Sequence, residues 1–425
     1  MITERPQPTR QRIIIVSDLH LGATSRPGYF EHGGEFHRFL EFLTQDGAGK
    51  ALCLRLIMLG DTFDFPSVPS RNGNRRDSDA DLLDRLQRVF DCHPQFTQAL
   101  NAYVAAGNRL DFLPGNHDPG LMRPVVQELV RSALSASPES DLHFHPWILS
   151  LPGLLYAEHG NQYHDINSFP EWLNAQMHPL NETSKPIGAK LDDLVMTLAS
   201  ETDRATDSAP ISLTVLVLDL IRNPGKLARS LPVFARFGVE VIRAAISTRS
   251  PVHARHRRRY RQTRMSAMRS ETGLSPNALT SIDRLAERNA HAWPGRIWKS
   301  GRSLVATRLQ RNGAPSESPT GLAMSGETRI THFRETGKKI AKILADDGQA
   351  VPIIAFGHTH LADVAHFRAT AVVNAGTWLD GAPGDSLTGL RRSEMSFIQI
   401  DVDASKGSPE VALLRWNDSG RKIQP

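Results

Sequence analysis

Residues 351–364 read VPIIAFGHTHLADV, and this stretch decides how the rest of the chain can be interpreted. Its first six residues are mostly apolar, which is typical of a strand buried within a sheet. Gly357 ends this run, and His358 and His360 follow with one residue between them. Both imidazoles can therefore face one pocket beyond the strand end. Taken alone, the pattern also fits a strand that ends in two solvated histidines.

Four earlier apolar segments end in the same way, with polar side chains directly after an expected strand. Strands expected at 13–17, 54–59, 109–113 and 154–158 are followed by DLHLG, GDTFD, PGNHD and HGN. Because the carboxyl ends of strands in α/β sheets converge on one site, we expect these side chains to meet. We call them the ligand set: Asp18, His20, Asp61, Asn116, His159, His358 and His360.

The chemistry of the ligand set predicts a metal centre. Carboxylates, imidazoles and one amide oxygen suit a hard or borderline divalent ion. The set is too large for one four- to six-coordinate ion, but it fits two ions about 3.5–4 Å apart that share a carboxylate. We expect two divalent ions, Mn²⁺ first, with Fe, Zn and Co as alternatives. Asp18 alone could merely cap a turn, but the repeated pattern argues against that reading.

The series DLH, GD, GNHD, HG and GHTH, in this order, resembles the calcineurin-like metallophosphoesterases. The resemblance covers about 13–165 and 350–380, and residues 374–378 (NAGTW) are similar to that family's strand after the histidine pair. It implies an α/β (α+β) fold, a sandwich of two facing β-sheets flanked by helices. It also implies that Asp18, His20 and His360 hold one ion, that Asn116, His159 and His358 hold the other, and that Asp61 bridges them.

The resemblance further implies hydrolysis of a phosphoester or pyrophosphate, with a hydroxide held between the two ions attacking phosphorus. His117 would give a proton to the leaving oxygen, and Asp64 would orient its imidazole. Two other readings stay open: Asp64 is a surface acid, or His117 lies beside the metals without a proton-transfer role. His164 is a further candidate, for substrate contact.

We expect three segments: the first part of the core at 1–165, a mostly helical, basic insertion or cap at 166–326, and the second part of the core at 327–425. The insertion contains an apolar segment at 211–221 and the run RHRRRYRQTR at 255–264. An apolar segment beside an Arg-rich one suits a lipid-bearing anionic ligand or an anionic membrane face through 211–264. The same run fits nucleic acid or a solvated basic loop.

Three functions remain open. The first is a phosphodiesterase or pyrophosphatase acting on a nucleotide-linked lipid, because the UDP-2,3-diacylglucosamine pyrophosphatases place a helical lid where this chain has its insertion. That branch usually has Arg at the position of His117, which is a departure. The second is a nuclease or cyclic-nucleotide phosphodiesterase with the same core. The third is a noncatalytic scaffold that binds a membrane or partner, against which the complete ligand set argues.

The composition of the 425-residue chain is that of an ordinary globular protein, with a formal net charge of +5. It has only two cysteines, Cys53 and Cys92, and no CxxC, which favours a reducing compartment. Residues 1–12 lack the apolar core of a signal peptide. We therefore expect a cytoplasmic protein, with peripheral contact at the inner membrane surface as an option.

Overall fold

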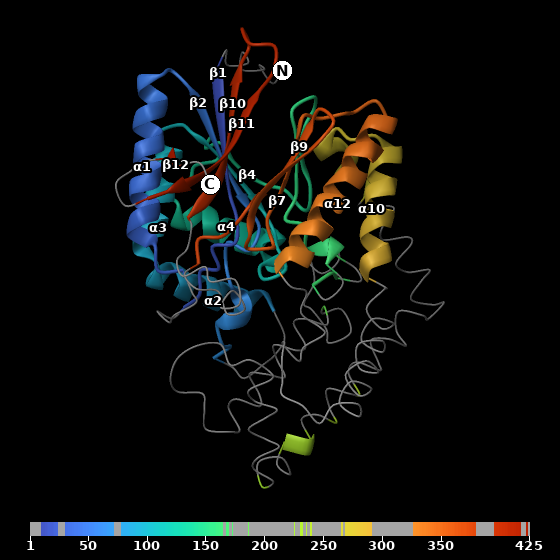
Figure 1. Cartoon of the computed structure of the whole chain (residues 1–425). Coiled ribbons are helices and arrows are strands. Elements are labelled where there is room, and N and C mark those ends of the chain that lie inside the picture. The colour runs from blue at the N-terminus through green and yellow to red at the C-terminus, as the bar shows by residue number, and fades with distance from the viewer. Residues whose placement is uncertain are drawn as a thin grey trace, which may run out of the picture.

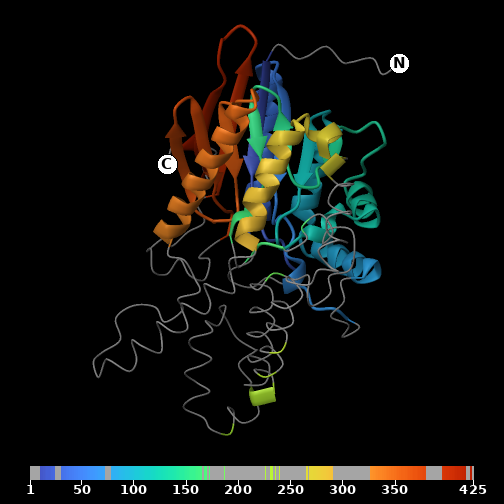
Figure 2. The ribbon, with the colours of Figure 1, turned by 90° about the vertical axis from the view of Figure 1, so that its right-hand side faces the viewer.

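The computed structural model describes residues 10–23, 30–71, 78–164, 167–169, 172, 186, 225, 230–232, 235, 239, 265–266, 268–290, 326–379, 395–417 and 422–423. Within this part of the chain, two β-sheets face each other and helices cover both outer faces (Figures 1 and 2). The sandwich predicted from the sequence is therefore confirmed.

The first sheet has seven strands in the order β12-β11-β10-β1-β2-β3-β4. Strands β1 to β4 run parallel, whereas β10 pairs antiparallel with β1 and β11 pairs antiparallel with β10. The strands are β1 (Arg10–Val16), β2 (Cys53–Leu59), β3 (Arg109–Leu113), β4 (Leu142–Phe144), β10 (Ser396–Asp403), β11 (Glu410–Trp416) and β12 (Lys422–Ile423).

The second sheet has five strands in the order β5-β6-β7-β9-β8, with β6, β7 and β9 parallel. They are β5 (Leu149–Leu151), β6 (Leu155–Ala157), β7 (Ile353–Phe356), β8 (Ala362–Phe367) and β9 (Thr370–Ala375). The central strands of both sheets are apolar on both faces because each is covered twice. Ile13 and Ile57 of the first sheet pack against Leu155 and Ala355 of the second in a core between the sheets.

The helices form the two outer layers (Figures 1 and 2). The first sheet is covered by α1 (Gly33–Gly49), α2 (Asp79–Cys92), α3 (Pro94–Ala105) and α4 (Pro124–Ala133), and the second by α10 (Pro276–Ala290) and α12 (Gly326–Asp346). Pro94 separates α2 from α3, since a proline inside a helical pattern breaks the helix. Short 3₁₀ turns are η1 (Phe65–Ser67), η2 (Pro119–Met122) and η3 (Asn161–Tyr163).

Some expectations from the sequence were wrong in detail. The single strand expected at 142–149 is two strands, β4 and β5, which belong to different sheets. Pro146 lies between them and cannot donate to a ladder, so the chain leaves one sheet there and joins the other. The edge strand β8 was not predicted. Cys53, whose apolar neighbours in the sequence favour a core position, is exposed at the start of β2.

The described part of the expected insertion includes α10, which packs on the core. Leu279 and Ile282 of α10 lie in one buried cluster with Ile340 and Leu344 of α12. The apolar segment 211–221 and the basic run 255–264 lie outside the described residues. Within the described chain, no helix is long and apolar enough to cross a bilayer.

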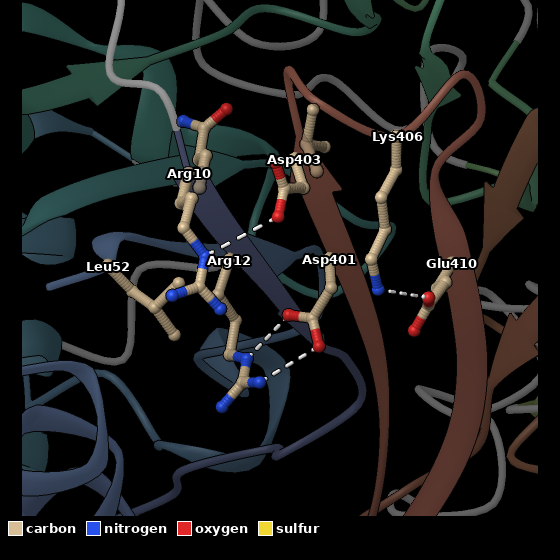
Figure 3. Close-up of a pocket in the computed structure, with 9 residues that line it drawn as sticks. Arg10, Arg12, Leu52, Asp401, Asp403, Lys406 and Glu410 are labelled. Atoms are coloured by element: carbon tan, nitrogen blue, oxygen red, sulfur yellow. Dashed lines mark hydrogen bonds and ion pairs between the residues drawn. The ribbon is translucent and has the colours of Figure 1, made fainter. Parts of the chain in front are cut away.

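Charged residues near the amino end of β1 form a network at the sheet surface (Figure 3). The buried guanidinium of Arg12 donates to both carboxylate oxygens of Asp401, at 2.6 and 2.8 Å, and to Asp46 at 2.6 Å. Lys406 and Glu410 form a separate, exposed ion pair at 2.8 Å beside it. Arg12 thus ties β1 to both α1 and β10.

A second network surrounds Asp111, whose carboxylate is fully buried in β3. It accepts hydrogen bonds from Arg55 at 2.8 and 2.9 Å, from Arg109, and from His145 at 2.7 Å. Burial alone would raise the pKa of Asp111, but His145 and the two arginines lower it well below its usual range. The network joins β2, β3 and the segment after β4.

Candidate metal centre

Five loops that follow β1, β2, β3, β6 and β7 carry the ligand set, and several contacts hold these loops together. The loops after β1 and β2 pair through backbone hydrogen bonds, from His20 N to Asp61 O at 2.9 Å and from Leu21 N to Thr62 O at 2.9 Å. The GHTH loop joins them because His358 N donates to Asp18 Oδ2 at 2.8 Å. Residues far apart in the sequence thus meet at one end of the sandwich.

The backbone of the ligand set is unusual. A positive φ costs a residue with a Cβ about 1–3 kcal/mol and is concentrated at functional sites. Among the described residues, five members of the ligand set adopt it: Asp18 (54°), His20 (50°), Asp61 (48°), His358 (69°) and His360 (60°). These turns aim the side chains inward instead of letting the strands continue.

Asp18, His20 and His360 form the first group that can hold a metal ion, with their ligand atoms within 4.8 Å of one another. The two Nε2 atoms of His20 and His360 are 3.2 Å apart. Asp18 Oδ1 lies 3.3 Å from Nε2 of His360 and 3.8 Å from Nε2 of His20. All three side chains point at one small volume.

Asp61, His159 and His358 form the second group, and all three are buried. Asp61 Oδ2 lies 3.2 Å from Nε2 of His159 and 3.7 Å from Nε2 of His20. Asp61 therefore faces both groups, as expected of a bridging carboxylate. Asn116 lies next to them, because the following residue, His117, donates its backbone N–H to Asp61 Oδ1 at 2.8 Å.

The residues fit a bound cation by a test independent of motif. Three buried atoms of the ligand set have no hydrogen-bond partner among the described residues: Asp18 Oδ1, Asn116 Oδ1 and His159 Nε2. A buried acceptor without a partner costs about 1–3 kcal/mol, so native proteins rarely leave one. Three such atoms on converging loops are explained if they bind a cation. His159 Nδ1 donates to the Leu59 carbonyl at 2.8 Å, which leaves Nε2 as the free ligand atom.

The charges of the site also favour a cation. Burial alone would lower the pKa of His159, but Asp61 and Asp18 raise it to about 9. Burial alone would raise the pKa of Asp18, but His159 and the neighbouring imidazoles lower it well below its usual range. In contrast, burial lowers the pKa of His358, and His164 and His159 add to this. Two buried carboxylates thus attract positive charge.

His117 and Asp64 lie beside the first group. His117 Nδ1 is 2.9 Å from Asp64 Oδ1, and the ring packs edge-on against His20 with centroids 4.5 Å apart. These three residues also form a third possible metal-binding group. Burial alone would raise the pKa of Asp64, but His117 lowers it. The His117 side chain is 27% exposed, so it can be reached from solvent, whereas Asp64 is 11% exposed.

Glycines next to the ligand set allow close approach of the loops. A Cβ at Gly60, which also has a φ of 84°, would lie 2.5 Å from Nδ1 of His159. A Cβ at Gly115 would lie 2.5 Å from the backbone N of Asp61, and one at Gly357 would collide with Ser17 and Asp18. The glycines of GD, GNHD and GHTH are thus explained by contact with the ligands.

Further side chains brace the loops without facing the ions. Asp118 precedes η2 and makes no side-chain cap there; its buried carboxylate accepts from the backbone N–H groups of Thr62, Phe63 and Gly115 at 2.6 to 3.1 Å. Thr377 of the NAGTW segment donates to the carbonyl of Asp18 at 2.7 Å.

The sequence analysis missed the surroundings of His358. His164 Nδ1 lies 3.0 Å from His358 Nε2, and Asn167 Nδ2 lies 3.2 Å from both nitrogens. The only signal was that His164 follows His159 closely in the chain. His164 had been considered as a substrate contact, and Asn167 had not been considered.

No protein-family model and no curated protein matches the sequence. Among solved structures, the chain is similar to the phosphopantetheinyl hydrolase PptH from Mycobacterium tuberculosis, with 10% identity over 87% of this chain and 91% of that chain, and a TM-score of 0.24. So low a score carries no argument, and the function must be argued from the site.

Proposed function

We propose that this protein is a two-metal phosphoester hydrolase of the calcineurin-like metallophosphoesterase superfamily. The observation that carries the proposal is the convergence of three buried atoms, from three loops, that have no hydrogen-bond partner in the described part of the chain and that lie at the two groups that can hold ions. Asp18, His20 and His360 would hold one ion, and Asn116, His159 and His358 the other, with Asp61 between them. Bound divalent ions would neutralise phosphoryl oxygens and make water a stronger nucleophile near neutral pH.

The protein's own residues supply orientation and a proton. Asp64 accepts a hydrogen bond from Nδ1 of His117, which fixes the orientation of the imidazole. The partly exposed His117 would give a proton to the leaving oxygen of the substrate. Asp118 and the loop glycines keep Asp61 in place, so the ligands need little rearrangement when ions bind.

For the substrate, we propose a phosphodiester or pyrophosphate, with a nucleotide-linked lipid first. This choice rests on the length and basic character of 166–326, whose apolar and Arg-rich segments suit an anionic amphiphile. Nucleic acid is the alternative. Because binding to nucleic acid weakens steeply with salt and acyl-chain binding does not, a salt titration separates the two.

The test is hydrolysis of bis-p-nitrophenyl phosphate with added Mn²⁺, comparing the wild type with Asp61→Asn. We expect turnover by the wild type that the variant lacks. UMP release from UDP-2,3-diacylglucosamine, measured in parallel, tests the lipid substrate separately. Protein that carries two ions per chain but shows no Asp61-dependent turnover of either compound would contradict the proposal and favour a noncatalytic scaffold.

A further inference from the structure

His358 differs from the other imidazoles of the ligand set because a second histidine lies against one of its ring nitrogens. Nδ1 of His164 is 3.0 Å from Nε2 of His358, which is hydrogen-bond distance. The side-chain amide of Asn167 lies 3.2 Å from both nitrogens and completes the cluster. The question is whether His164 binds an ion itself or positions His358.

The composition of the metal-binding groups answers this question. The second group contains Asp61, His159 and His358, and none of the groups found among the described residues includes His164. Nε2 of His358 already contacts Nδ1 of His164 at 3.0 Å and Nδ2 of Asn167 at 3.2 Å. The Nε2 side is therefore the outer side of the ring, and Nδ1 is the nitrogen left for the ion.

His159, the neighbouring ligand, is also fixed by a hydrogen bond from one ring nitrogen, while its other ring nitrogen faces the site. His159 donates from Nδ1 to the Leu59 carbonyl at 2.8 Å and presents Nε2 toward Asp61. Metal-binding histidines usually donate their second ring N–H to a fixed acceptor, which sets the tautomer and the ring orientation. For His358, the acceptor at the matching place is a side chain, His164.

The loop that carries His164 is itself fixed. Gly160, at a φ of 101°, turns the chain after His159, and the carbonyl of Tyr163 accepts a hydrogen bond from His332 of α12 at 2.7 Å. The Tyr163 hydroxyl donates to the buried Glu158 at 2.7 Å. Phe333 of α12 packs beside the His358 ring, with centroids 5.9 Å apart. A rigid loop of this kind can hold an acceptor in one place.

We propose that His164 is a positioning residue for the second ion. Its Nδ1 accepts the Nε2 hydrogen of His358, which keeps Nδ1 of His358 unprotonated and directed at the ion. The side-chain amide of Asn167 can donate to the same nitrogen of His164. This inference rests on the proposed two-ion centre, and it adds His164, near the end of the first core segment, and Asn167, at the start of the expected insertion, to the support of that centre.

The experiment compares His164→Leu with His164→Asn. Leucine removes the acceptor, whereas the Asn side-chain oxygen can occupy nearly the position of His Nδ1 and still accept. His366→Leu, at an exposed position on β8, is the matched control. Protein stripped with EDTA is titrated with Mn²⁺ by calorimetry, and a thermal melt of each stripped variant checks its folding.

We expect His164→Leu to weaken the binding of one of the two ions by about 10–100-fold and to leave the affinity for the other nearly unchanged. Substitutions of residues that support metal ligands have effects of this size. His164→Asn should keep affinity within about threefold of the wild type, as His366→Leu should. Asn167→Ala should weaken the binding of the same ion, and it replaces His164→Leu in the test if that variant does not fold.

Two results would overturn the inference alone while leaving the two-ion centre intact. In one, the wild type binds two ions and His164→Leu, or Asn167→Ala in its place, binds both equally tightly. In the other, His164→Asn binds Mn²⁺ as weakly as His164→Leu does, which would show that ion binding depends on the packing of His164 and not on its hydrogen-bond acceptor. A wild type that binds no second ion would overturn both this inference and the proposed function.

Discussion

Gly115→Ala tests whether the PGNHD loop carries glycine because it presses against Asp61. A Cβ at Gly115 would lie 2.5 Å from the backbone N of Asp61 and 2.7 Å from its Cγ. Nonbonded heavy atoms prefer about 3.5–4 Å, so the two loops would have to separate by about 1 Å. Gly115 is absent from the described glycines with positive φ, so the substitution tests contact and not backbone strain.

Overpacking of this kind lowers the free energy of unfolding by about 1–3 kcal/mol. A shift of about 1 Å in a positioned group lowers turnover by about 100-fold. Mn²⁺ affinity should fall about tenfold or more, because Asp61 is displaced from between the two groups.

The assays are urea unfolding of EDTA-stripped protein and Mn²⁺ titration. Gly49→Ala is the control, since a Cβ there, at the end of α1, meets nothing within 4 Å. The reasoning is refuted if Gly115→Ala matches Gly49→Ala in both stability and Mn²⁺ affinity.

Three further predictions address the networks and the proton donor. Asp111→Asn should lower the free energy of unfolding at pH 7 by about 3–5 kcal/mol, because it leaves the buried guanidinium of Arg55 without its charged partner. Since the folded pKa of Asp111 is depressed, its stabilisation is complete above the unfolded pKa of about 3.9, and the difference in unfolding free energy between wild type and variant should narrow as pH falls below that value. A pH-independent difference in urea titrations would contradict this. Arg12→Met should lower the free energy of unfolding by about 1.5–3 kcal/mol in the same assay, because Arg12 is buried in its network. Lys406→Met, at an exposed ion pair, should leave the free energy of unfolding unchanged. Equal effects of the two substitutions would contradict the role of the buried network. His117→Ala should lower kcat by about 100- to 10,000-fold while two ions stay bound, and Asp64→Asn should act in the same direction; unchanged kcat in His117→Ala would make it a spectator.

Much of the fold was predictable because strand periodicity and strand-end chemistry are local signals. The runs at 13–17, 54–59 and 351–356 are buried on both faces and read directly as central strands. Each is followed by polar residues whose convergence follows from parallel pairing. The pairing of His117 with Asp64, implied by family resemblance, is present as a 2.9 Å contact.

Other features depend on contacts that one sequence does not encode locally. The left-handed backbone of residues such as Asp18 and Asp61 is held by contacts with neighbouring loops, against the steric cost of a Cβ at positive φ. An aspartate directly before a proline, such as Asp118 before Pro119, is typical of a helix cap, but the Asp118 carboxylate accepts from backbone N–H groups of the GDTFD loop and of Gly115 instead. Strand β8 alternates half-buried and exposed residues at a sheet edge, which gives a weak hydrophobic pattern.

The division into core and insertion stays a prediction. The sequence predicts a mostly helical, basic insertion at 166–326. Helix α10, which lies within this range, contributes Leu279 and Ile282 to the buried cluster between the second sheet and its helices. Contact between α10 and α12 is long-range information that hydrophobic spacing alone does not supply. The membrane and nucleic-acid partners expected through 211–264 likewise remain proposals.

The most direct test of the two-ion centre is anomalous X-ray diffraction from crystals soaked in Mn²⁺. We predict two strong peaks about 3.5–4 Å apart within the ligand set, with Asp61 in contact with both. A single peak, or Mn²⁺ bound elsewhere while Asp18, Asn116 and His159 contact no ion, would contradict a dinuclear centre.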